Sequence, residues 1–190
     1  MSRLPAANRE TFPEELTYVW DRLDRDATAA DGSGAANIFR AMGNNPRILL
    51  GYLRLANPLW AHCGLDVKTR EIVILRAAYV QNSAYEWHQH VRIGREAGLS
   101  DARIVALHDW QTSDLFNSLE RATLGYADAL VASDHPSQDV HDELAKHLPV
   151  AGVVGVNLLV GAYIMTAKFL GAMEVQPEDA FVGWRLAGDS

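Results

Sequence analysis

Apolar residues recur at intervals of three and four along most of this 190-residue chain, the spacing typical of helices with one buried face. No pair of strand-like runs, hairpin turn or internal repeat stands out in the sequence. The pattern therefore predicts an all-α, compact multi-helix fold. The expected helices cover residues 13–24, 37–42, 46–56, 66–81, 83–97, 100–107, 113–132, 137–147 and 150–171.

Local signals place several of the helix ends. Asp66 is a good N-cap, and Gly98 suits the left-handed position that follows the last turn of a helix. Pro58 should end or kink the helix that begins at Pro46, because proline lacks the amide hydrogen that a helix interior uses. The β-branched run 72–75 resembles a strand, but the length and capping of its segment favour a helix.

A polar break of small residues at 25–34 separates the first predicted helix from the rest. We therefore expect an N-terminal arm and first helix over residues 1–35 and a helical domain over residues 36–175. A loose C-terminal tail should follow over residues 176–190, where Pro177 opens an irregular segment.

Charge and composition exclude some classes of function. The net charge is −7 and no run of Lys and Arg occurs, which argues against a nucleic-acid partner. The first 16 residues lack the apolar stretch of a secretory signal. Cys63 is the one cysteine, so no internal disulfide can form, and we expect a cytoplasmic protein.

Residues 150–167 are mostly apolar and about as long as a bilayer crossing requires. Asn157, Tyr163, Thr166 and several glycines interrupt this segment, and no cluster of Lys and Arg precedes it. We therefore expect a buried or subunit-contacting helix and no membrane partner.

Four polar residues stand out within the apolar helical segments between residues 71 and 90. They are Glu71, Ser83, Glu86 and His90. An ideal helix turns ~100° per residue, so His90 returns to within about 20° of Ser83, with Glu86 on the same side. A hydroxyl, a carboxylate and an imidazole along one stripe are groups from which proton-transfer sites are built.

These residues also have purely structural interpretations. Glu86 and His90 lie at i and i+4, a pair that stabilises a helix by roughly 0.2–0.5 kcal/mol. Glu71 is favourable near a helix N-terminus, and Arg76 needs a partner if buried, either a glutamate or a substrate carboxylate. His88 and His90 point about 160° apart on a helix, so we expect no metal site.

Two motifs carry a resemblance to a known family. The first is Leu65-x-x-Lys68-x-Arg70-Glu71-Ile72-Val73-Ile74-Leu75-Arg76-Ala77-Ala78, and the second is Asn82-x-x-Tyr85-Glu86-Trp87-x-x-His90, followed by Ala97-Gly98-Leu99-Ser100. Together they resemble the carboxymuconolactone decarboxylase family, whose superfamily also contains the alkylhydroperoxidase D-like proteins. The resemblance is specific over residues 65–107 and compatible from residue 39 to residue 170.

The resemblance implies a compact helical unit that assembles as a homo-trimer or hexamer, with sites near subunit contacts. In the peroxidase branch, the positions matching Glu71, Ser83, Glu86 and His90 are Glu, Cys, Cys and His. Both cysteine positions are replaced here, and a dithiol mechanism needs two sulfurs. The Tyr-Glu-Trp block before His90 is closer to the decarboxylase-like branch, which implies an acid/base site without a cofactor.

We therefore expect a cofactor-independent enzyme of the carboxymuconolactone decarboxylase type. Its substrate would be a small conjugated carboxylate or lactone, transformed by general acid/base catalysis. His90 is the expected proton donor or base, Glu86 is expected to orient it, and Glu71 is a second acid/base candidate.

Four further residues are expected to contact the substrate. Arg76, with Arg70 as second choice, would hold a substrate carboxylate in a forked contact. Ser83 lies on the proposed stripe, and Trp87 would either wall the pocket or pack. Tyr85 would reach the site if the helix begins after it.

Three other functions fit parts of the pattern. A hydrolase, isomerase or hydratase would use the same acid/base groups. An alkylhydroperoxidase-like redox protein is disfavoured by the missing thiol pair. A non-catalytic helical oligomer would fill the stripe with neighbouring side chains and leave no cavity, whereas an enzyme should show an enclosed pocket.

Overall fold

The computed structural model describes residues 2–26, 34–133 and 135–186. Within these residues every regular element is a helix, which confirms the predicted all-α class. The elements are η1 (Arg9–Thr11), η2 (Glu14–Leu16), α1 (Thr17–Arg25), α2 (Asn37–Met42), α3 (Pro46–His62), α4 (Val67–Val80), α5 (Ala84–Glu96), α6 (Asp101–Ala106), η3 (Leu107–Thr112), α7 (Ser118–Ala132), α8 (Gln138–Ala145) and α9 (Val150–Met173).

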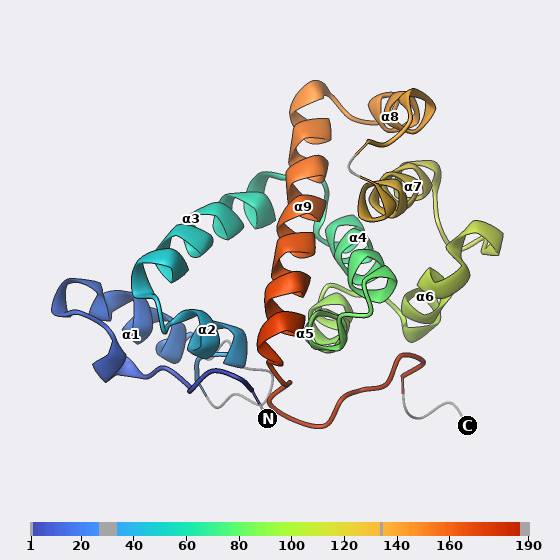
Figure 1. Cartoon of the computed structure of the whole chain (residues 1–190). Coiled ribbons are helices and arrows are strands. Elements are labelled where there is room, and N and C mark those ends of the chain that lie inside the picture. The colour runs from blue at the N-terminus through green and yellow to red at the C-terminus, as the bar shows by residue number, and fades with distance from the viewer. Residues whose placement is uncertain (1, 27–33, 134, 187–190) are drawn as a thin grey trace.

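Helix α4 lies at the centre of the molecule, beside the long α9, and also packs against α5 and α7 (Figure 1). Its four-residue apolar run faces two cores at once. Val73 and Ile74 belong to a core shared with α7, α8 and α9, whereas Ile72 and Leu75 belong to a core shared with α5 and α6. A helix buried on all sides needs apolar residues all round, which explains the strand-like composition of this segment.

Several predicted helix ends are confirmed. The Asp66 side chain accepts hydrogen bonds from the amides of Lys68 and Thr69, as an N-cap does. Gly98 follows α5 with φ of +89°, a left-handed conformation that glycine adopts without strain. The predicted helix from residue 113 starts later, at Ser118, because Asn117 forms a capping box with Glu120.

Pro58 was expected to end or kink the third predicted helix, and it does not end it. Helix α3 continues through Pro58 to His62. Tertiary packing overrides the lost backbone hydrogen bond, because Leu59 is buried in the core and Trp60 is hydrogen-bonded to α9. The extension matters because it carries Trp60 toward the site.

The described part of the predicted loose tail, residues 176–186, packs against the rest of the protein. The Trp87 indole donates a hydrogen bond to the carbonyl of Gly183, and the Val182 amide donates one to His88. His88 also contacts Asp179 at 2.5 Å. The tail thus packs along α5, where it satisfies polar groups of that buried helix.

One described helix, α9, is long and apolar enough to cross a membrane by its length and composition. About 44 % of its most apolar window is buried inside the structure. It packs against α3, α4 and α7, and it passes so close to the chain after α3 that a Cβ at Gly155 would lie 2.3 Å from the Cys63 carbonyl oxygen. The buried face of α9 therefore belongs to the protein core.

In Figure 1, α3 diverges from α9 toward α1 and α2, so that these helices form a second lobe beside the α4–α5–α9 unit. The lobe has its own core, in which Phe12, Leu16 and Trp20 pack with Leu49 of α3. The N-terminal segment is therefore folded onto α3. A cavity lies between this lobe and α5, and the candidate functional site described below is located there.

Candidate functional site

A buried hydrogen bond joins the two central helices at the site. His90 Nδ1 of α5 lies 2.6 Å from Glu71 Oε2 of α4. Arg70 holds the other carboxylate oxygen, with its Nε 2.9 Å from Glu71 Oε1, and donates a second bond to the Trp60 carbonyl. Burial opposes ionisation of Glu71, but His90 and Arg70 together lower its pKa. Glu71 is therefore an anion fixed between two donors.

This geometry corrects the role expected for Glu86. The sequence favoured Glu86 as the carboxylate that orients His90, but Glu71 makes that contact. Glu71 comes from the preceding helix, and the packing of α4 on α5 brings the two residues together. The same contact corrects the expectation for Arg70, whose guanidinium is committed to Glu71 and to the protein backbone.

A chain of hydrogen bonds extends from the other side of the imidazole. Tyr163 Oη of α9 lies 3.1 Å from His90 Nε2, and the Trp60 indole donates to the same Tyr163 oxygen at 2.9 Å. An ionised Glu71 only accepts, so Nδ1 of His90 carries a proton. In the neutral imidazole Nε2 then accepts from the Tyr163 hydroxyl, and every donor in the chain has an acceptor.

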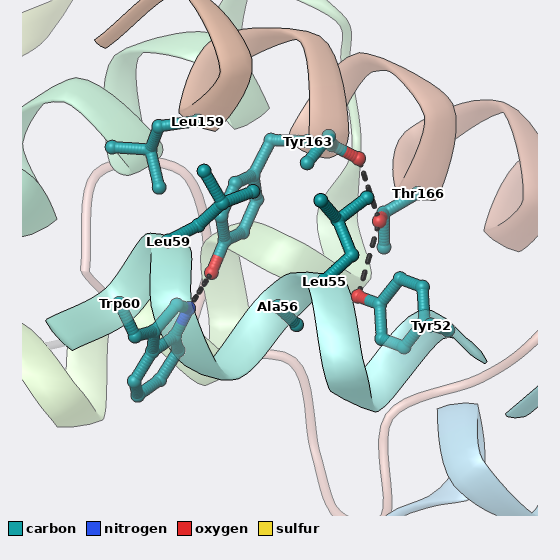
Figure 2. Close-up of a pocket in the computed structure, with 9 residues that line it drawn as sticks. Tyr52, Leu55, Ala56, Leu59, Trp60, Leu159, Tyr163 and Thr166 are labelled. Carbon is teal, nitrogen blue, oxygen red and sulfur yellow. Dashed lines mark hydrogen bonds between the residues drawn. The ribbon is translucent and has the colours of Figure 1, made fainter. Parts of the chain in front are cut away.

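Sequence reasoning did not select Trp60 and Tyr163 for this role. They lie 30 residues before and 73 residues after His90. The one signal was a tyrosine within an otherwise apolar helix, and it does not identify a partner. Figure 2 shows Trp60 and Tyr52 reaching from α3 to Tyr163 and Thr166 of α9, beside a hollow of about 20 Å³ that is too small for a substrate.

Glu86 has a different environment from Glu71. It is buried, and neither of its carboxyl oxygens has a hydrogen-bond partner among the described residues. Burial raises its pKa from the ordinary 4.5 to about 8, an effect that the nearby Ser83 hydroxyl only partly offsets. Burial therefore favours the protonated form of Glu86, the form that can donate a proton.

Glu86 lines a large cavity, with its two carboxyl oxygens buried in the wall. The cavity has a volume of about 710 Å³ and lies between α3, α5 and the N-terminal lobe. His90, Glu86 and Tyr163 line its inner end, and much of its wall is aromatic and aliphatic. The wall includes Ile38, Phe39, Leu50, Tyr52, Leu53, Trp60 and Tyr85. Volume and lining are those of a small-molecule site.

The raised pKa of Glu86 gives a test by stability. The folded-state pKa of about 8 exceeds the ordinary 4.5, so the folded protein should lose stability as pH rises between these values. Glu86→Gln should remove this loss and be more stable than the wild type above pH 8, by up to ~4 kcal/mol. Urea unfolding at about pH 5 and about pH 8.5 measures the difference.

Glu96→Gln is the matched control for that measurement, because Glu96 also lines the cavity but its side chain is 62 % exposed. It should leave the pH dependence of the unfolding free energy nearly unchanged. A Glu86→Gln variant with the same pH dependence as the wild type would show that Glu86 is an ordinary, ionised glutamate.

Two residues expected to bind substrate have structural roles instead. Arg76 pairs with Asp128 of α7 through contacts of 2.6 and 2.9 Å, and also donates to two backbone carbonyls. Trp87 is fully buried in the core between α4, α5 and α6. Both side chains point away from the cavity because α5 and α4 bury a second face against η3 and the tail.

Of Ser83 and Tyr85, only Tyr85 is among the residues that line the cavity. Ser83 is buried and precedes α5 without capping it, and it does not line the cavity. Tyr85 does line the cavity although α5 begins one residue before it. Its hydroxyl donates to Glu178 of the tail and accepts from the Ile38 amide, and burial together with Glu178 raises its pKa.

The described residues contain no group of three or more His, Cys, Asp or Glu side chains placed to hold a metal ion. His88 lies on the tail side of α5, away from His90, as the predicted divergence of the two rings requires. Cys63 is buried beside α9.

Comparison with known families gives one match to a family model. The model of the carboxymuconolactone decarboxylase family matches residues 46–129, which hold Trp60, Glu71, Glu86 and His90. An uncharacterised protein of Escherichia coli (strain K12), YnjA, is 29 % identical over 86 residues. That match covers 45 % of this chain and 47 % of YnjA, so the chain spans about half the length of this curated relative.

Solved structures share the fold over nearly the whole chain. A peroxidase-related protein from Ralstonia eutropha JMP134, described as an alkylhydroperoxidase AhpD core, is 15 % identical with a TM-score of 0.81, and the match covers 97 % of both chains. A variant of the debrominase Bmp8 in complex with 2,3,4-tribromopyrrole is 19 % identical with a TM-score of 0.77, covering 92 % of this chain and 91 % of that one. At these identities the similarity is one of fold.

Proposed function

We propose that this chain is a cofactor-independent enzyme acting by general acid/base catalysis, a proposal supported by the match of residues 46–129 to the model of the carboxymuconolactone decarboxylase family. Its substrate is a small conjugated carboxylate or lactone, and its reaction is a decarboxylation. The observation that carries the proposal is the buried, unpaired carboxyl of Glu86, which lines a cavity together with a histidine held by a carboxylate.

The groups are suited to the two charges that such a reaction moves. When carbon dioxide leaves, the electron pair of the broken C–C bond passes into the conjugated carbonyl and forms an enolate. The Tyr163 hydroxyl carries one proton, so it can donate to the enolate oxygen when His90 Nε2 is protonated and donates to the Tyr163 oxygen in turn. Glu86 then gives its proton to carbon, and the resulting carboxylate takes a new proton from solvent.

The apolar wall of the cavity supports the choice of substrate. Aromatic and aliphatic side chains favour a flat, conjugated body and exclude water from the developing negative charge. A protein of the same fold binds tribromopyrrole, a small conjugated ring. A thiol-based peroxidase is the weaker alternative, because the one cysteine of this chain, Cys63, does not line the cavity.

A substrate screen tests the proposal. The purified protein should release carbon dioxide and remove conjugated absorbance from at least one member of a panel of unsaturated lactone acids and dienoic acids. Glu86→Gln should lower that turnover by about two orders of magnitude, since the amide cannot supply the proton. Turnover that is equal in the wild type and in Glu86→Gln would contradict the proposed role.

Tyr163→Phe tests the contribution of the Tyr163 hydroxyl separately from that of the His90 imidazole. Phenylalanine keeps the aromatic packing but removes the hydroxyl that joins His90 to Trp60. Turnover should fall roughly tenfold or more, because one preorganised donor to the developing charge is lost. Steady-state rates measure this effect.

Tyr52→Phe is the control for Tyr163→Phe. Tyr52 also lines the cavity, but its hydroxyl bonds to Thr166 and not to His90. The control should lose much less turnover. Equal losses in both variants would mean that tyrosine hydroxyls act only through general packing of α3 on α9.

A further inference from the structure

Three arginines line the cavity of this otherwise acidic chain. They come from three helices: Arg22 from α1, Arg54 from α3 and Arg92 from α5. The net charge of the whole chain is −7, so a group of guanidinium side chains on one cavity is opposite in sign to the overall charge. Asp26 and Glu96 line the same cavity and offset the charges of Arg22 and Arg92, so the excess positive charge that can attract an anionic ligand is that of Arg54.

The arginines differ in how far their charge is already neutralised. Arg92 Nη1 lies 3.0 Å from Glu96, and Arg22 Nε lies 3.5 Å from Asp26; all four side chains are substantially exposed. Such exposed pairs are weak and leave most of each guanidinium available. Arg54 makes no hydrogen bond or ion pair with any residue that the structure describes.

Arg54 is also placed at a definite position relative to the acid/base groups. It lies six residues before Trp60 on α3, a rise of ~9 Å along the helix axis. The Trp60 ring in turn contacts His90, with ring centroids 5.7 Å apart. Asn57, one turn after Arg54, lines the cavity between these two positions.

Apolar side chains line the cavity together with Arg54. Leu50 and Leu53 of α3 and Phe39 of α2 line the cavity with Arg54. At about 710 Å³, the cavity exceeds what a single small ring would fill and falls within the range of sites for larger ligands. A ligand that uses this space has an apolar body with a reacting group at one end and an anionic group at the other.

We propose that Arg54, assisted by Arg92, is a carboxylate-binding subsite that holds an end of the substrate that does not react. The ligand class is an extended, conjugated carboxylic acid whose retained carboxylate binds at Arg54, ~9 Å along α3 from the Trp60 ring that contacts His90. The inference rests on the proposed function for the reacting end of the ligand. It replaces Arg76 and Arg70, which are committed to Asp128 and Glu71, as the carboxylate receptor.

Binding of trans-cinnamate and of trans-cinnamamide tests the subsite without catalysis. The two probes share their shape and conjugated body but differ in charge. At low salt, calorimetry should show that the wild type binds the carboxylate about tenfold or more tightly than the amide, as expected for a charge-assisted contact with arginine. Arg54→Gln should remove most of this preference, and Arg92→Gln should reduce it.

Arg47→Gln is the matched control. Arg47 lies on the same helix, is exposed and pairs with Glu15, and it does not line the cavity. Its variant should keep the full preference for the carboxylate. Equal affinity of the wild type for both probes, absence of cinnamate binding, or an unchanged preference in Arg54→Gln would each overturn the subsite.

A failure of the Arg54 subsite can be distinguished from a failure of the proposed decarboxylation. If charge discrimination is absent while Glu86→Gln still abolishes turnover, the acid/base site stands and the Arg54 subsite is wrong. If the discrimination depends on Arg54 but no conjugated acid is decarboxylated, the subsite stands and the reaction is wrong.

Discussion

His90→Gln is expected to lower turnover by about two orders of magnitude or more, with little change in folding. Glutamine is similar in reach to histidine and can still donate a hydrogen bond to Glu71, but it cannot bind the extra proton with which His90 would support the Tyr163 hydroxyl as a donor to the enolate. The effect should exceed that of Tyr163→Phe, because His90 connects the Glu71 carboxylate to the Tyr163 hydroxyl at 2.6 and 3.1 Å.

Steady-state kinetics on any substrate found in the screen measure this loss. His62→Gln serves as the control, because His62 is exposed at the end of α3 and does not line the cavity. It should retain wild-type rates. If His90→Gln also turns over at the wild-type rate, His90 serves only to stabilise α4 against α5.

Arg76→Met should lower the free energy of unfolding by about 3 kcal/mol, because it leaves Asp128 without its charged partner. Two backbone carbonyls, of Leu107 and His108, also lose their donor. The pair is largely buried, with side-chain exposures of 11 % and 23 %, so water compensates only in part. Chemical denaturation measures the loss.

The control for Arg76→Met is Arg47→Met, which breaks an exposed pair with Glu15 and should cost less than about 1 kcal/mol. Substrate affinity should be unchanged in Arg76→Met at temperatures where the variant is folded. Wild-type stability combined with weakened substrate binding would instead return Arg76 to the substrate-contacting role that the sequence indicated.

The fold was predictable because its determinants are local. Asp66 and Gly98 mark helix ends through interactions within a few residues, and the apolar spacing defines each buried face. Pro58 shows the limit of this reasoning. A local rule ends the helix there, whereas burial of Leu59 and the hydrogen bond from Trp60 to α9 carry it on to residue 62.

The sequence indicated candidate residues for the site but not their pairings. Glu86 and His90 line the cavity, and Glu71 contacts His90 from α4. Helical spacing suggested Glu86 as the partner of His90, but spacing along one helix carries no information about the adjacent helix. Packing of α4 on α5 decided for Glu71 and left Glu86 unpaired.

Contacts over long sequence separations were outside the reach of the sequence. Tyr163 reaches His90 across 73 residues, and Asp128 reaches Arg76 across 52. Nothing in the spacing of these residues distinguishes them from ordinary core or surface positions. The tail beyond residue 176 is held by polar contacts to α5 and by apolar side chains, among them Trp184 and Leu186, that pack beside Trp87. These residues follow no helical spacing, so a search for apolar periodicity does not detect them.

If Glu86 is the proton donor, it must hold its proton at the pH of the reaction, and its charge state can be measured. Difference infrared spectroscopy of the wild type against Glu86→Gln follows the carbonyl band of a neutral carboxylic acid during a pH titration. We expect a band that persists at neutral pH, is lost near pH 8 as Glu86 ionises, and is missing in the variant. Loss of that band below about pH 5 would mean an ionised Glu86 and no proton donor at the cavity.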